Sequence, residues 1–168
     1  MKDKLTKQVV DFLLEIGLEV RSAKIEEDAV LPGILIRDGG LIVDEEQLEH
    51  PGDLLHEAGH LAVVTPERRQ RMGSDAGIKI HEEIAALAWS WAALHHLELP
   101  ADVVFHEQGY HGASPNLIAA FRENCGPGIP YLAWLEMCSD PNAGPDAKTK
   151  LPPFPTMTRW LRQSRAGS

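Results

Sequence analysis

The segment GDLLHEAGHLA, residues 52–62, constrains this chain more than any other because it contains the pattern H-E-x-x-H. Successive residues of an α-helix are turned by about 100°, so His56 and His60 lie on one face, one turn apart. Two imidazoles placed in this way can bind one metal ion. Glu57 follows the first histidine and projects beside the ion, where its carboxylate can take a proton from water. The pattern predicts a metal site with a general base on one helix.

The residues around this pattern favour a buried site over a solvated helix surface. The neighbouring positions are mostly apolar: Leu54, Leu55, Ala58, Leu61, Ala62, Val63 and Val64. Charged groups among such residues need partners. Gly59 costs a helix about 1 kcal/mol relative to alanine, which predicts a close contact at this position. The sequence Pro51-Gly52-Asp53 is typical of a helix start, and we expect the Asp53 side chain to cap the helix.

A catalytic zinc site has three protein ligands and one open position, so a third ligand has to come from elsewhere in the chain. The metzincin pattern requires Gly and His three and six residues after the second histidine, and these positions hold Val63 and Pro66. The metzincin arrangement is therefore excluded. An acidic ligand is the next option, and the candidates are Glu82 and Glu83 in the following long helix and Asp75 in the loop before it.

Helical periodicity distinguishes the two adjacent glutamates. In the helix expected over residues 78–97, one apolar face contains Ile80, Ile84, Leu87, Trp91 and Leu94. Glu83 borders this face, whereas Glu82 points nearly opposite. A carboxylate at the edge of the apolar face can reach into a buried site, so we predict Glu83 as the third ligand, with Glu82 and Asp75 as alternatives. A first-turn glutamate also interacts favourably with the helix dipole, and we expect one of the pair to do only that.

Together, His56, Glu57, His60 and the segment EEIAALA at residues 82–88 resemble the zincin metallopeptidases, and specifically the gluzincin arrangement. Within that class the chain is similar to small bacterial proteases of the ImmA/IrrE type. The similarity lies in the order of the motifs and covers roughly residues 33–97. The resemblance implies one zinc ion on His56, His60 and Glu83, with Glu57 as the base. It also implies a peptide or protein substrate, held by strand addition to an edge strand that the hairpin at residues 33–44 would supply.

The chain after residue 97 departs from this resemblance, so no residue that stabilises a transition state can be carried over by position. Local candidates lie in the segment FHEQGYHG, residues 105–112. A hydrogen bond from His106, Tyr110 or His111 to a developing oxyanion would serve this purpose. A polar surface turn is the alternative interpretation of the same segment.

The remaining patterns predict an α+β fold, mostly helical, with a small sheet or hairpin before the metal-site helix. We expect helices over residues 3–16, 78–97, 114–122 and 129–137, a strand within 19–25, and an exposed loop over 66–77. Apolar runs on either side of Asp38-Gly39-Gly40 indicate a β-hairpin. Residues 1–138 would form one zincin-like domain. The proline-rich residues 139–168 would form an extended surface tail with a short helix over 156–162.

Composition excludes several classes of function for the 168-residue chain. Its formal charge of −9 argues against binding to nucleic acid. No apolar run approaches the roughly 20 residues that span a bilayer, and the first residues do not resemble a signal peptide. Cys125 and Cys138 lack the spacing of a zinc knuckle, and we expect two buried free thiols. A cytoplasmic location fits these features best.

Two interpretations of function follow from the sequence. The first is a zinc-dependent hydrolase, specifically a metallopeptidase, in which Glu57 acts as the general base on water activated by the metal. The second is a zincin-like domain that binds a peptide or a metal without cutting, or that uses zinc only to hold its core together. Both interpretations require the same metal ligands, and they differ in whether the metal keeps an open position beside a cleft.

Overall fold

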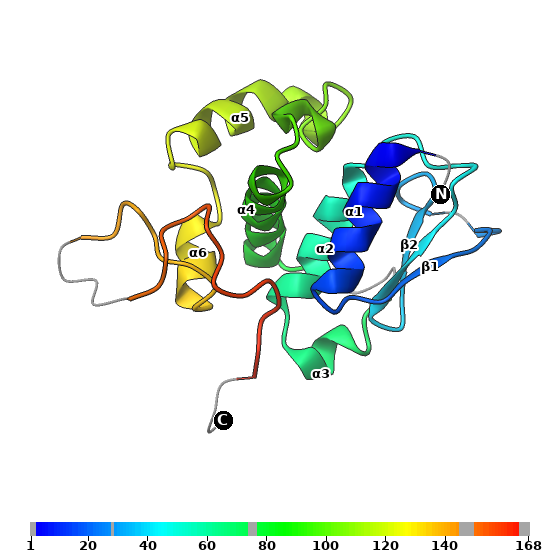
Figure 1. Ribbon diagram of the computed structural model, residues 1–168, viewed down its shortest axis with the longest axis horizontal. Helices are drawn as coiled ribbons and strands as arrows, with labels where there is room; N and C mark the ends of the chain where they lie inside the picture. The colour runs from blue at the N-terminus through cyan, green and yellow to red at the C-terminus, as the bar shows by residue number, and fades with distance from the viewer. Residues whose placement is uncertain (1–2, 28, 74–76, 145–149, 165–168) are drawn as a thin grey trace.

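The computed structural model of this chain describes residues 3–27, 29–73, 77–144 and 150–164. Within them it contains six α-helices and a small three-stranded mixed sheet, so the predicted α+β class is confirmed. Helix α4 runs through the centre of the molecule, with α6 on one side, α2 and α1 on the other, and the sheet outermost (Figure 1). None of the helices in the described ranges combines the length and the apolar character that crossing a membrane requires.

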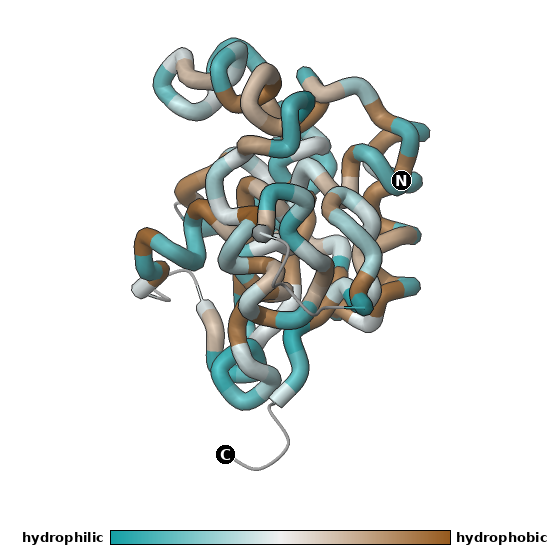
Figure 2. The backbone as a smooth tube through the Cα atoms, turned by 90° about the vertical axis from the view of Figure 1, so that its left-hand side faces the viewer, coloured by the Kyte–Doolittle hydropathy of each residue, from teal (hydrophilic) through white to brown (hydrophobic). Residues whose placement is uncertain are grey.

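Helix α1 (Lys4–Glu15) covers the outer side of α2 and has the amphipathic pattern predicted for this region. The Asp3 side chain caps it by accepting a hydrogen bond from the Thr6 N–H at 2.8 Å. Val9, Phe12 and Leu13 fill its buried side. In Figure 2, short hydrophobic stretches alternate with hydrophilic ones along the tube, as expected for elements that each bury one side.

The sheet consists of β1 (Val20–Ser22), β2 (Ile34–Arg37) and β3 (Gly40–Val43), in the order β1-β3-β2. Strands β2 and β3 form the predicted hairpin, with Asp38 and Gly39 at positive φ in the turn. Strand β1 pairs with β3 in parallel. Strand β2 is therefore an edge strand, and it lies beside α2.

Helices α2 (Asp53–Val63) and α4 (Ile80–His96) form the most extensive contact between elements. Gly59 lies at their crossing, and a Cβ atom built there would be 3.0 Å from both the Cα and the carbonyl oxygen of Ala86. The predicted close contact at Gly59 is thus confirmed. It holds the two helices near enough for side chains of both to share one site.

The prediction that Ile80 belongs to the apolar face by which α4 packs into the core is wrong. Ile80 is 83% exposed, whereas Leu87 and Leu94, predicted on the same face, are buried. The first turn of α4 extends beyond the core, while the later turns are buried on several sides, including the positions of Ala86 and Trp89. Periodicity therefore identified the helix but did not show where its burial begins.

The shorter elements differ from expectation in several places. Residues 66–77 were expected to form only a loop, but Pro66–Arg69 form the helix α3, capped by the Thr65 side chain. A 3₁₀-helix, Ala101–Val103, follows α4, and a second one, Tyr110–Gly112, precedes α5. Helix α5 (Ser114–Arg122) agrees with the prediction, and α6 (Ile129–Trp134) ends earlier than the predicted residue 137.

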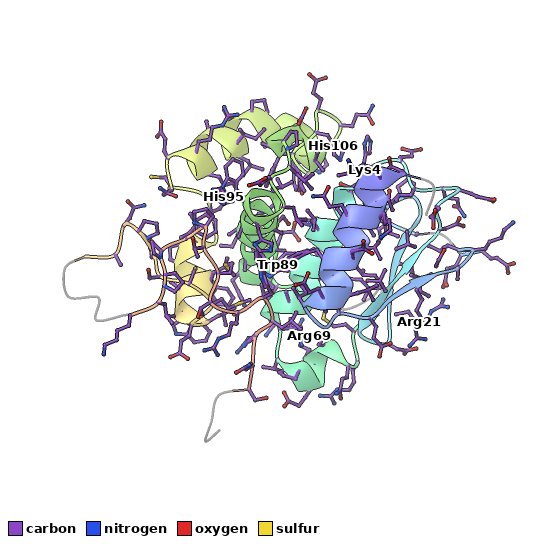
Figure 3. The ribbon with its side chains drawn as sticks, in the orientation of Figure 1. Lys4, Arg21, Arg69, Trp89, His95 and His106 are labelled. Atoms are coloured by element: carbon purple, nitrogen blue, oxygen red, sulfur yellow. The ribbon has the colours of Figure 1, made fainter. Side chains whose placement is uncertain are left out.

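The C-terminal segment is irregular, as expected, but its predicted course along the surface is wrong. Phe154 is 2% exposed and belongs to the hydrophobic core. The Trp160 carbonyl accepts a hydrogen bond at 2.9 Å from the indole N–H of Trp89, which Figure 3 labels on α4. Residues 150–164 contain no helix, so the short helix expected over 156–162 is not formed.

The two cysteines have different environments. Cys138 is buried, as predicted, whereas Cys125 is exposed just after the end of α5. The chain turns sharply here, with Asn124 at a φ of 56°, and this turn carries Cys125 away from the core. The expectation of two buried thiols is therefore wrong for Cys125.

Candidate metal centre

His56 and His60 from α2 and Glu83 from α4 converge on one point. The two Nε2 atoms are 3.1 Å apart. Glu83 Oε1 lies 3.3 Å from His56 Nε2, and Glu83 Oε2 lies 3.3 Å from His60 Nε2. Both imidazoles are buried, while the Glu83 side chain is 43% exposed. The close helix crossing at Gly59 brings these three side chains together from two elements.

These distances fit a metal ion. Zinc binds nitrogen and oxygen ligands at about 2.0–2.1 Å in a tetrahedron, whose edge is then about 3.3–3.4 Å. The 3.1 Å between the two Nε2 atoms is close to that edge, and each of these nitrogens has one of the two Glu83 oxygens at a similar 3.3 Å. Within the described part of the chain, Nδ1 of both His56 and His60 is buried without a hydrogen-bond partner. Without a metal, the two facing Nε2 atoms can share only one proton as a hydrogen bond. A metal cation would instead accept a lone pair from each nitrogen.

The protonation states of His60 and Glu83 also suit metal binding, which requires neutral imidazoles and an ionised carboxylate. Burial and the adjacent His56 lower the pKa of His60 to about 4, so this side chain is neutral at pH 7. A hydrogen bond from His56 lowers the pKa of Glu83 despite its partial burial, with the neighbouring histidines acting in the same direction.

Glu57 lies next to the three converging side chains. Ligand atoms of His56, Glu57 and His60 all lie within 4.8 Å of one another. Burial raises the pKa of Glu57, and the carboxylates of Glu83 and Asp53 raise it further, while His56 opposes them. A carboxylate with a raised pKa is a stronger base, which is the property that proton transfer from water requires.

The other two candidates for the third ligand are not at this point. Glu82 forms an ion pair with Arg68 and accepts a hydrogen bond at 3.0 Å from the Lys79 N–H, so it acts at the start of α4. It is 4% exposed, on a different side of the helix from Glu83. Asp75 lies outside the described residues. The geometry therefore favours Glu83.

A cavity of about 620 Å³ lies beside the site. Residues Ile34, Leu35 and Ile36 of the edge strand β2 line it on one side, and the metal-site residues of α2 and α4 line it on another. The segment from His106 to His111 closes a third side, and it includes all three residues that the sequence suggested as substrate contacts: His106, Tyr110 and His111. The cavity gives the candidate metal centre an open side.

The His106 side chain connects this segment to the start of α2. Its Nε2 lies 3.0 Å from Asp53 Oδ1, and the His50 ring stacks on it at a centroid distance of 3.9 Å. His106 extends from the connection between α4 and α5 (Figure 3). The predicted cap by Asp53 is wrong, because the N-cap of α2 is Gly52 and no side-chain cap hydrogen bond forms there.

Sequence reasoning missed Asp53, His50 and Gln108 as residues of this cavity. Of these three residues, only Asp53 could have been inferred from the sequence. It precedes His56 by three residues and therefore lies on the same helix face. His50 Nε2 lies 3.0 Å from the Gln108 side-chain oxygen, a contact across 58 residues of sequence. Local patterns do not contain such long-range contacts.

Of the three suggested contacts, Tyr110 packs against a candidate metal ligand. Its ring packs edge-on against His56, with a centroid distance of 5.7 Å. Burial and the carboxylates of Asp53, Glu83 and Glu57 raise its pKa well above the ordinary value, so the phenol stays protonated and can donate a hydrogen bond. Tyr110 and His111 both have positive φ, a costly backbone conformation of the kind that often occurs at functional sites.

Comparisons of the chain with protein-family models, with curated proteins and with solved structures find no match. The functional argument therefore rests on the geometry of the site.

Proposed function

We propose that this protein is a zinc-dependent hydrolase, specifically a metallopeptidase with a gluzincin-like arrangement of ligands. The observation that carries the proposal is the convergence of His56, His60 and Glu83, with the two Nε2 atoms separated by close to the edge of a zinc tetrahedron. Glu57 beside these ligands and the cavity at their open side supply the other two requirements of a hydrolytic site.

Each residue has a distinct role in the proposed reaction. Zinc, when bound, would supply a Lewis acid and lower the pKa of water at its open position to about 7. Glu57 accepts a proton from water and returns it to the leaving amine of the substrate. In this proposal the protonated Tyr110 phenol donates a hydrogen bond to the oxygen of the attacked carbonyl, and His111 at the same cavity is a further candidate donor. His106 is not available for this role, because its Nε2 is engaged with Asp53 and its Nδ1 is buried.

The edge strand β2 offers a way to hold a peptide beside these groups. The Asp44 N–H donates to the Gly33 carbonyl, so by the alternation of antiparallel ladders the main-chain groups of Ile34 and Ile36 point away from β3. The Ile34 N–H donates to the Leu31 carbonyl at 3.2 Å, so a peptide would pair mainly with the main-chain groups of Ile36. Ile34 and Ile36 also line the cavity. An extended peptide can add to this edge through main-chain hydrogen bonds.

The cavity also favours catalysis over a purely structural metal. Structural zinc sites are closed by four protein ligands, whereas catalytic sites keep one position open. Here two histidines and one glutamate converge, and the cavity lies next to them. A zinc ion that only holds the core together would instead require a closed site.

The substitution Glu57→Gln tests the proposed role of the base. We expect the zinc-loaded variant to keep its metal and to lose about 10²–10⁴-fold in hydrolysis of a mixed peptide library, because general-base catalysis contributes that much. Glu15→Gln, an exposed carboxylate on α1, is the matched control and should leave hydrolysis unchanged. Undiminished hydrolysis by Glu57→Gln would contradict the role of Glu57, and zinc-loaded wild type that leaves the whole library intact would contradict the peptidase.

A further inference from the structure

We propose that the cavity selects extended peptide segments that combine large aliphatic side chains with lysine or arginine and that lack acidic residues. The proposal rests on the proposed function, because it names the substrate class of the same site. Two independent properties of the cavity carry it: an aliphatic rim and an acidic lining.

The aliphatic rim is formed by side chains that a soluble domain would ordinarily bury. Val30 is 90% exposed and Ile78 is 41% exposed, and both line the cavity. Both are among the few large hydrophobic side chains that the described residues leave exposed.

The rim continues into the cavity as a wall without charges. Leu31, Pro32 and the edge strand residues Ile34 and Ile36 line it on the side of β2. Aliphatic side chains on both the rim and the wall favour a substrate with large aliphatic side chains, since burial of each one is worth about 1.5–3 kcal/mol.

Apart from five histidines, the ionisable side chains that line the cavity are all acidic. Glu49, Asp53, Glu57 and Glu83 line the cavity, and no lysine or arginine does so among the described residues. A divalent ion on His56, His60 and Glu83 would offset only part of this negative charge. Glu49 is exposed and lies next to His50, four residues before α2 begins and seven residues before His56 in sequence. A cationic side chain of a bound peptide would gain from this lining, and an acidic one would be repelled.

Peptide binding to zinc-loaded Glu57→Gln tests the proposal without requiring turnover. Four fluorescent peptides of equal length would be compared by anisotropy: aliphatic with lysine, aliphatic with glutamate, serine with lysine, and serine with glutamate. We expect the aliphatic lysine peptide to bind at least about tenfold tighter than any of the other three. Partial burial of one large aliphatic side chain, or one favourable charge contact, is enough for about a tenfold change in the dissociation constant. Equal dissociation constants for the four peptides would overturn the proposal.

Variants separate the two properties. Val30→Ser and Ile78→Ser should weaken binding of both aliphatic peptides several-fold and leave the preference for lysine over glutamate intact. Glu49→Gln should reduce that preference and leave the aliphatic preference intact. Leu14→Ser and Glu15→Gln are the controls, because they change an exposed leucine and an exposed glutamate on α1, outside the cavity. They should change neither the aliphatic preference nor the preference for lysine. Equal effects of the cavity variants and the α1 variants would overturn the assignment of binding to this cavity.

The same experiment distinguishes this inference from the proposed hydrolysis. Selective binding by Glu57→Gln, with no cleavage of the bound peptide by zinc-loaded wild type, would overturn the peptidase and uphold the selectivity. Cleavage of all four peptides by wild type with equal efficiency would uphold the peptidase and overturn the selectivity.

Discussion

At the scale of single residues, Glu82 and Glu83 are adjacent but have different roles. Glu83 faces two histidines of α2, while Glu82 is almost fully buried against Arg68 and the start of α4. The 100° turn between neighbouring helix residues sends their carboxylates to different sides. This part of the site could be predicted from the sequence, because it follows from periodicity alone. The partner of Glu82 could not, since Arg68 lies on another helix.

We expect Glu82→Gln to lower the free energy of unfolding by about 2 kcal/mol at pH 7, the contribution of hydrogen bonds to a charged group. Burial opposes ionisation of Glu82, but its hydrogen bonds with Arg68 and the Lys79 N–H lower its pKa below the ordinary 4.5. The stabilisation is therefore complete above pH 4.5 and is lost as the pH falls through the lower folded-state pKa.

Urea unfolding of metal-free wild type and Glu82→Gln between pH 7 and pH 3 measures this effect. The difference between the two proteins should shrink towards pH 3. A difference that stays constant over this range would show that the Glu82 charge does not stabilise the fold.

At the scale of secondary-structure elements, the site depends on the separation of α2 and α4. Gly59 is located between the two histidines in sequence and touches Ala86, three residues beyond Glu83. A larger residue at this crossing would push apart the two helices that carry the proposed ligands. The unfavourable glycine in the middle of α2 is thus explained by packing.

We expect Gly59→Ala to destabilise the protein by about 1–3 kcal/mol, the usual cost of overpacking, despite the higher helix propensity of alanine. The new methyl group would lie 3.0 Å from backbone atoms of Ala86, which cannot rotate away. The same change should weaken zinc binding, because Glu83 moves with α4. Thermal unfolding and zinc titration measure the two effects.

Gly144→Ala is the matched control, because a Cβ at Gly144 meets no atom within 4 Å. It should leave both stability and zinc affinity unchanged. Wild-type stability and affinity in Gly59→Ala would contradict the assignment of Gly59 as a spacing residue.

The elements themselves were predicted well where a local pattern repeats. Helix α1 and the hairpin of β2 and β3 follow from periodicity and from the Asp38-Gly39 turn. Helix α3 was missed because its four residues are too few to show a repeat. The exposure of Ile80 was missed because periodicity reports which residues share a face, and the surrounding fold decides whether that face is covered.

At the scale of the whole molecule, the C-terminal segment helps to hold α2 in place. The Arg69 guanidinium donates to the Leu61 carbonyl at 2.6 Å and to the Arg162 carbonyl at 3.1 Å. The Arg162 N–H in turn donates to the Ala62 carbonyl at 2.8 Å. These contacts bind the end of α2 to residues about 100 positions later in the chain. A proline-rich sequence without periodicity gives no indication of them.

The zinc content of the purified protein tests the central claim most directly. Elemental analysis after zinc loading and desalting would compare wild type with His56→Ala, Glu83→Gln and Glu82→Gln. We predict about one zinc per chain in wild type and in Glu82→Gln, and little or none in the other two variants, because His56, His60 and Glu83 converge whereas Glu82 pairs with Arg68. Zinc-free wild type, or retention of zinc by Glu83→Gln at the wild-type level, would contradict the proposed metal centre.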